Sequence, residues 1–171
     1  VQQQRRLIAI GDVVYSTPGI TAPLTAFDAA TGKVLKVYKG TERTQEVAYE
    51  DGILYLVIGD PYNPGAAYTW IRVDHRDTSL GGSDPKESFD GAGFTRGRPD
   101  NRSDKENPTC VIRALSPASG KILWETKPMS GYIGATLALK NGKAAYRTSE
   151  AIVCRDAKSG KVLWTGAKGT R

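Results

Sequence analysis

The chain has 171 residues, of which 39% are hydrophobic and 25% charged, with 19 glycines and 9 prolines. This composition is typical of one globular, turn-rich domain and excludes a collagen-like or wholly disordered chain. No apolar run reaches the roughly 18 residues that span a membrane. The formal net charge of +6 comes from residues 110–171, which carry 11 basic and 3 acidic side chains. Most of these lysines stand beside turn glycines, and no basic strand with interleaved aromatic residues accompanies them, so a nucleic-acid partner is not indicated.

The cysteines and the histidine limit the catalytic chemistry that this chain can carry alone. Cys110 and Cys154 lie 44 residues apart with no neighbouring Cys or His, and His75 is the single histidine. These residues cannot build a zinc tetrad, a Ser-His-Asp triad or a Cys-His site. The sequence leaves open whether the two cysteines form a disulfide or remain buried thiols.

Taken in chain order, three runs typical of β-strands each follow a turn pair. The pairs are Gly11-Asp12, Asp51-Gly52 and Asn141-Gly142, and the runs are 13–15, 53–58 and 143–146. Asp-Gly and Asn-Gly between apolar runs favour tight hairpins, because both central positions of a type I′ turn need positive φ. Each run contains a tyrosine, at positions 15, 55 and 146, with intervals of 40 and 91 residues.

A second turn recurs in three segments that align without a gap, at 26–36, 114–124 and 154–164. Its glycines, Gly32, Gly120 and Gly160, are separated by 88 and 40 residues. Glycine supplies the left-handed backbone that such a turn needs. The tyrosine series and the glycine series each contain one interval of 40 residues and one interval that is about 50 residues longer. Because the two long intervals overlap in the chain, a single insertion explains both.

Four antiparallel strands in every 40 residues predict the blade of a β-propeller. A β-sandwich would not repeat its turn motif at a fixed offset, and helical repeats would show apolar residues three and four positions apart. The predicted fold class is therefore all-β, with about three blades of an incomplete propeller. We expect a first repeat at 1–44, a second at 45–60 and 110–129, an insertion at 61–109, and a third repeat at 130–171.

The recurring segment, Ala-x-Asp-x-x-x-Gly-Lys-x-x-Trp, resembles the tryptophan-docking motif of the pyrroloquinoline-quinone (PQQ) repeat β-propeller superfamily. In that family the tryptophan of one blade stacks on the glycine turn of the next blade. This sequence departs from the motif at three positions: Lys36 stands in place of Trp, Ser116 in place of Asp and Cys154 in place of Ala. The matching residues are Ala26, Asp28, Gly32 and Lys33 in the first copy, Ala114, Gly120, Lys121 and Trp124 in the second, and Asp156, Gly160, Lys161 and Trp164 in the third.

The resemblance implies two functions. Its members include PQQ- and calcium-dependent alcohol and sugar dehydrogenases, and also scaffold lipoproteins of the outer-membrane assembly machine. The adjacent cysteine pair of the large dehydrogenases is absent, because Cys110 and Cys154 are far apart. We therefore expect a non-catalytic binding or assembly scaffold; the alternative is part of a quinoprotein dehydrogenase whose catalytic residues, PQQ and calcium lie in further blades of a longer chain. Those further blades are the expected partners, and the periplasm or cell envelope is the location that the resemblance implies.

The insertion at 61–109 differs in composition from the repeats, because it holds five of the nine prolines and six glycines. Loops of this length in compact domains are usually functional or disordered. A lid or contact with a protein partner, and a solvated, partly disordered excursion, both stay open. Asp84, Glu87 and Asp90 are weak candidates for calcium ligands, because carboxylate oxygens suit that ion but no EF-hand spacing is present.

Overall fold

The computed structural model describes residues 6–19, 21–60, 70–72, 94–96 and 109–166, with backbone alone at 70–72 and 94–96. Every regular element within these ranges is a β-strand. The chain divides into two compact units, one formed by Val1–Tyr62 with Asn107–Arg171 and the other by Asn63–Glu106. No helix in the part of the chain that the structure describes is long and apolar enough to cross a membrane.

The first sheet contains four antiparallel strands in the order β1-β2-β3-β4. These are β1 (Leu7–Ile10), β2 (Val13–Ser16), β3 (Leu24–Asp28) and β4 (Val34–Tyr38). Apolar and β-branched residues dominate them, and such residues pack well on a pleated surface.

The second sheet has the order β10-β9-β6-β5, so the chain leaves it after its second strand and returns to form the third. Its strands are β5 (Thr44–Glu50), β6 (Ile53–Gly59), β9 (Thr109–Leu115) and β10 (Ile122–Glu125), and the short β11 (Met129–Ser130) also pairs with β9. The insertion interrupts this sheet between β6 and β9. Within the second unit, β7 (Trp70–Arg72) and β8 (Phe94–Arg96) form an antiparallel pair.

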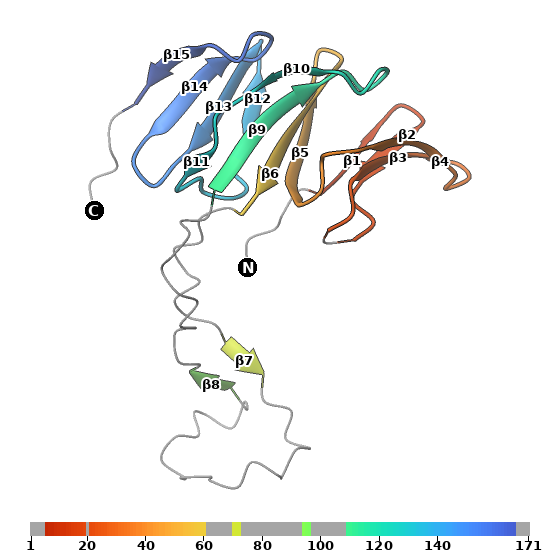
Figure 1. The fold of residues 1–171 in the computed structure, drawn as a ribbon, viewed down its shortest axis with the longest axis horizontal. Coiled ribbons are helices and arrows are strands. Elements are labelled where there is room, and N and C mark those ends of the chain that lie inside the picture. The colour runs from red at the N-terminus through yellow and green to blue at the C-terminus, as the bar shows by residue number, and fades with distance from the viewer. Residues whose placement is uncertain (1–5, 20, 61–69, 73–93, 97–108, 167–171) are drawn as a thin grey trace, which may run out of the picture. The chain divides into compact units, whose positions relative to one another are not determined.

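The third sheet repeats the four-stranded antiparallel order as β12-β13-β14-β15. Its strands are β12 (Ala138–Lys140), β13 (Lys143–Arg147), β14 (Ile152–Asp156) and β15 (Val162–Thr165). The three sheets stand side by side with the second in the middle (Figure 1). The prediction of an all-β fold with an insertion in the second of three antiparallel sheets is thereby confirmed, and the sheets have four, five and four strands.

The hairpin turns have the backbone that their residues require. Asp51 and Gly52 have φ angles of 50° and 80°, and Asn141 and Gly142 have 51° and 70°. Positive φ at both central positions defines the type I′ turn, whose twist matches that of the flanking strands.

The strand register corrects one equivalence drawn from the sequence. Glu50 pairs with Ile53 across the second hairpin and Lys140 with Lys143 across the third, so position 53 corresponds to 143 and position 55 to 145. The counterpart of Tyr55 in the third sheet is therefore Ala145, and Tyr146 lies on the opposite face. Because side chains alternate between the faces of a strand, this shift of one residue changes which neighbour the tyrosine meets.

Two apolar clusters fill the spaces between the sheets. One joins the first sheet to the second and includes Leu24, Tyr38, Leu54 and Leu115. The other joins the second sheet to the third and includes residues such as Tyr55, Ile112 and Tyr146. The first and second sheets thus each present one face to the sheet that follows in the chain, and the core of the first unit lies in these two contacts.

Candidate functional site

The repeated turn is held by a hydrogen-bonded acidic side chain. In the first turn, Asp28 Oδ1 accepts hydrogen bonds from the backbone N–H and the hydroxyl of Thr31, at 2.7 and 2.6 Å. In the third, Asp156 Oδ1 accepts the same pair of bonds from Ser159 at 2.8 and 2.7 Å. The hydroxyl bond is the main cause that lowers the pKa of each carboxyl, followed by the backbone bond. Both turns are therefore rigid local structures that fold from their own residues.

Each turn closes on a glycine in the left-handed region. The glycines at 32, 120 and 160 have φ angles of 69°, 77° and 71°. Each N–H donates to the backbone carbonyl four residues earlier, at 2.9, 2.7 and 2.8 Å respectively. The missing Cβ also leaves a flat surface on which a neighbouring side chain can lie.

The contact between the second and third sheets centres on Trp124, which lies across Gly160. A Cβ added at Gly160 would come within 2.6 Å of Trp124 Cδ2. The indole N–H of Trp124 donates to the carbonyl of Ala157 in the same turn, at 2.7 Å. The side chain on the outer strand of one sheet is thus bonded to, and stacked on, the turn of the next.

Tyr55 on β6, two strands away from Trp124 in the same sheet, reinforces this contact. Its hydroxyl donates to the same Ala157 carbonyl at 3.1 Å, and its ring centroid lies 6.1 Å from that of Trp124. Burial, more than the nearby acidic residues Glu50, Asp51 and Asp156, raises the pKa of Tyr55 to about 12. The hydroxyl therefore remains a proton donor to the turn at physiological pH.

The contact between the first and second sheets uses a different pair of side chains. Lys36 stands where the motif has tryptophan, and its ammonium donates to the carbonyl of Ala118. Tyr38 donates its hydroxyl to the carbonyl of Pro117 at 2.8 Å, and the ammonium of Lys36 lies 5.5 Å from the Tyr38 ring centroid. Both side chains approach Gly120, whose Cβ would lie 3.4 Å from Lys36 Cε. A hollow of about 330 Å³ remains at this contact, so the lysine fills less of the space than an indole would.

A buried acidic residue, absent from the motif, joins the second and third sheets at their adjacent strands β5 and β12. Glu46 is 2% exposed; it accepts hydrogen bonds from the Tyr132 hydroxyl at 2.8 Å, from the Ala135 N–H, and from the Leu137 N–H at 3.3 Å. Burial raises the pKa of Glu46, and these hydrogen bonds oppose that rise. The one sequence feature that marks it is an acidic residue at the centre of a strand with buried neighbours.

Trp164 differs from Trp124 in its surroundings. It is 50% exposed, and within the described residues no hydrogen bond reaches its indole and no sheet follows β15 (Figure 1). Gly32 is in the reverse situation, because nothing lies within 4 Å of a Cβ placed there. The two ends of the three-sheet array therefore each hold half of the contact that joins the sheets within it.

The described residues include no cluster of the side chains that usually hold a metal ion. Among them no three His, Cys, Asp or Glu side chains lie close enough to hold a metal ion. Cys110 on β9 and Cys154 on β14 are buried free thiols on different sheets. Burial raises the pKa of Cys110 to about 12, with smaller contributions from Asp60 and Glu46. The candidate calcium ligands at 84, 87 and 90, and the histidine at 75, lie outside the described residues.

Comparison with known proteins agrees with this architecture. A PQQ-repeat family model, described as outer membrane protein assembly factor BamB, matches residues 109–169. The quinohemoprotein alcohol dehydrogenase ADHIIG from Pseudomonas putida HK5 aligns over 96% of this chain and 20% of its own, with 15% identity and a TM-score of 0.55. No curated protein matches the sequence.

Two other solved structures align over nearly the whole chain. One is a europium-containing methanol dehydrogenase, with 12% identity, a TM-score of 0.49 and coverage of 94% of this chain and 24% of that one. The other is the computationally designed Ika8 protein, with 13% identity, a TM-score of 0.40 and coverage of 95% and 49%. The chain spans about a fifth to a quarter of the length of the two dehydrogenases.

The sheet order, the repeated turn and the likeness in fold define a protein of the β-propeller class, built from four-stranded blades. The PQQ-repeat family model matches the part of the chain that holds the second and third copies of the motif, and the recognition made from the motif is confirmed.

Proposed function

We propose that the chain acts as a non-catalytic binding or assembly scaffold. The observation that supports this most directly is the use of the motif side chains. Trp124 and Lys36 are bonded to the turns of neighbouring sheets, and the carboxyl of Asp156 is bonded within its own turn. Side chains engaged in this way hold the sheets and their turns together, which supports a structural role for the motif.

The position of the insertion supports a role in binding a protein partner. The chain leaves the second sheet after Gly59 and re-enters it at Thr109, and Gly59 pairs with Cys110 across the ladder. The backbone N–H of Asp60 also donates to the Thr109 carbonyl at 3.0 Å. Both connections to the inserted unit, Asn63–Glu106, thus start from neighbouring strands of the second sheet, and long insertions of this kind often carry binding function.

The family match supports the same proposal and a location at the cell envelope. The model that matches residues 109–169 is described as an outer membrane protein assembly factor. The likeness to a quinohemoprotein alcohol dehydrogenase is a likeness of fold at 15% identity. Dehydrogenase activity is therefore the second candidate, to be excluded by assay.

Two measurements test the proposal. In the first, PQQ and calcium are added to the full-length protein, with any further blades present, and quinone absorbance and dye-linked alcohol oxidation are followed; neither binding nor turnover is expected. In the second, the intact chain and a variant with 63–106 replaced by a short Gly-Ser linker are compared as baits for cell-envelope proteins. We expect a stoichiometric partner that only the intact chain retains. Stoichiometric PQQ binding with alcohol oxidation would replace the scaffold proposal by the dehydrogenase.

A further inference from the structure

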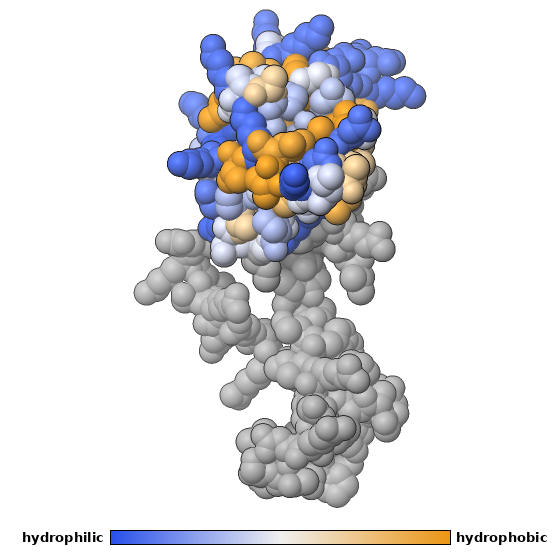
Figure 2. All heavy atoms as spheres, turned by 90° about the vertical axis from the view of Figure 1, so that its right-hand side faces the viewer, coloured by the Kyte–Doolittle hydropathy of each residue, from blue (hydrophilic) through white to orange (hydrophobic). Residues whose placement is uncertain are grey.

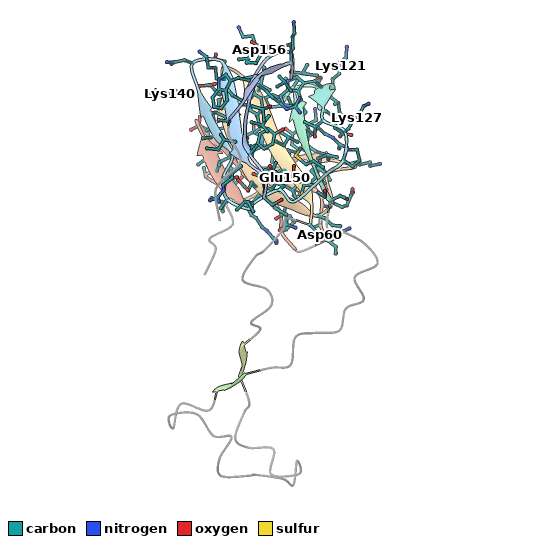
Figure 3. The ribbon with its side chains drawn as sticks, turned by 90° about the vertical axis from the view of Figure 1, so that its left-hand side faces the viewer. Asp60, Lys121, Lys127, Lys140, Glu150 and Asp156 are labelled. Carbon is teal, nitrogen blue, oxygen red and sulfur yellow. The ribbon has the colours of Figure 1, made fainter. Side chains whose placement is uncertain are left out.

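The contact between the first and second sheets contains an open hollow of about 330 Å³ beside the strands β4 and β10. One wall is β4 with the residues that follow it, and the other is β9, the repeated turn and β10. This volume lies within the range of small-molecule sites. Lys121, next to Gly120, marks this end of the second sheet, and Asp60 lies at the opposite end (Figure 3). The hollow is thus at the other end of the strands from the attachment of the insertion.

The hollow lies where the closed contact between the second and third sheets has an indole. There, three ring atoms of Trp124 would come within 2.6, 2.8 and 2.9 Å of a Cβ placed at Gly160. At Gly120, the atoms nearest to such a Cβ are Lys36 Cε at 3.4 Å and Tyr38 Cδ1 at 3.5 Å. The lysine therefore covers its glycine turn less closely than the indole does, and space remains beside the turn.

Part of the lining of the hollow is apolar. Leu115 pairs with Ile122 across β9 and β10, so both side chains lie on the face that the second sheet turns toward the first. Tyr38 reaches the same apolar cluster from the first sheet. Ile122 lines the hollow and is still 47% exposed. An aromatic ring placed here would therefore contact apolar surface and remove part of Ile122 from water.

Basic residues border the same hollow. Lys36 and Lys39 lie on one wall and Arg113 on the other, and in the described part of the chain no acidic residue lines it. Arg113 donates from Nε to Glu125 Oε2 at 2.5 Å and from Nη1 to the Gly40 carbonyl, so among the described residues its Nη2 has no partner. No described carboxylate pairs with either lysine. The positive charge around the hollow thus exceeds what Glu125 balances, which favours an anionic ligand.

We infer that this hollow binds a small aromatic carboxylate, with the ring beside the Gly120 turn and the carboxylate between Lys36 and Arg113. The ring fills the apolar part, and the carboxylate accepts charge-assisted hydrogen bonds from the cations. Figure 2, which faces the first sheet, shows hydrophobic and hydrophilic residues next to each other on this side of the molecule. The inference goes beyond the scaffold function, because the site lies within the contact between two sheets and needs no protein partner.

The probe for the test is indole-3-acetate, which carries one indole ring and one carboxylate. It is titrated into the isotope-labelled full-length protein, and binding is followed by NMR chemical shifts. We expect saturable binding with a Kd of about 1 mM or lower, an affinity within reach of ligands of this size. The largest shifts are expected at the amides of the Gly120 turn. Indole, which lacks the anion, and acetate, which lacks the ring, should each bind about 10-fold more weakly.

Two substitutions at one position separate the space from the charge. Lys36→Trp fills the hollow with an indole of the chain itself and should abolish the binding of indole-3-acetate. Lys36→Met keeps the hollow and removes the ammonium, so affinity for indole-3-acetate should fall about 3-fold while affinity for indole stays the same. Lys33→Gln is the matched control, because it removes an exposed lysine of the same sheet that does not line the hollow. This variant should bind as the native protein does.

Three results would overturn the inference. These are the absence of saturable binding up to about 10 mM indole-3-acetate, binding that Lys36→Trp leaves unchanged, and binding of indole as tight as that of indole-3-acetate. Circular dichroism and urea midpoints establish that each variant is folded. Because PQQ binding, alcohol oxidation and partner capture are separate readouts, a failure here is distinguishable from a failure of the scaffold proposal.

Discussion

Removal of the indole that joins the second and third sheets tests the central contact of the fold. Trp124→Ala deletes the ring over Gly160 and the hydrogen bond to the Ala157 carbonyl at 2.7 Å. Truncation of a buried tryptophan costs about 3–5 kcal/mol. Because Trp124 is only partly buried, we expect the low end, about 3 kcal/mol. Trp124→Phe keeps a ring but loses the bond, and should cost roughly 1–2 kcal/mol.

The free energies of unfolding come from urea titrations followed by circular dichroism. Trp164→Ala is the reference and should cost at most about 1 kcal/mol because its indole is half exposed. Gly160→Ala, which places a Cβ 2.6 Å from the ring, is matched by Gly142→Ala at nearly the same φ with nothing within 4 Å. The first should exceed the second by about 1–3 kcal/mol. Equal costs at both tryptophans and at both glycines would refute the docking geometry.

Three further outcomes follow from the other contacts. Burial raises the pKa of Glu46 above its ordinary value of 4.5, so the folded chain binds this proton more tightly than the unfolded chain does. The free energy of unfolding should therefore fall as the pH rises from the ordinary pKa through the raised pKa of the folded chain. Urea titrations should show this fall in the native chain and not in Glu46→Gln. Lys36→Trp should raise the free energy of unfolding by about 1 kcal/mol, because an indole would fill part of the hollow of about 330 Å³ beside Gly120. A lower urea midpoint for this variant would contradict the prediction. Cys110, with its pKa raised to about 12, should resist alkylation by iodoacetamide at pH 8 in the folded chain and react in urea, as peptide mass analysis will show.

The sequence was sufficient to predict the repeat because two kinds of turn recur in it. The Asp-Gly and Asn-Gly hairpins and the Asp-x-x-x-Gly turns need residues that adopt positive φ or bond their own backbone. These residue types therefore recur at fixed spacing and can be recognised in the sequence. The sheet topology follows from their spacing, and a single insertion at one strand boundary accounts for the exception.

The details of the contacts between sheets were harder to predict. The sequence predicts Tyr146 as the third member of the tyrosine series, whereas the strand register makes Ala145 the counterpart of Tyr55. A shift of one residue is invisible in composition but moves a side chain to the other face of the sheet. Glu46 was missed for another reason: its partners, Tyr132 and the N–H groups of the segment before β12, lie about 90 residues away in the chain.

The attachment of the insertion at the end of the β6–β9 ladder bears on which sequence changes the chain can accept. Gly59 and Cys110 are paired at the last rung of the β6–β9 ladder, and at Gly59 a φ of 118° and the nearby Thr109 carbonyl leave no room for a Cβ. The two stems are therefore clamped together before the inserted sequence begins. Since doubling the length of a closed loop costs only about 0.6 kcal/mol, this position can accept segments of very different size and origin. The second sheet therefore offers a position at which the inserted segment, and with it the binding specificity, can change while the core stays the same.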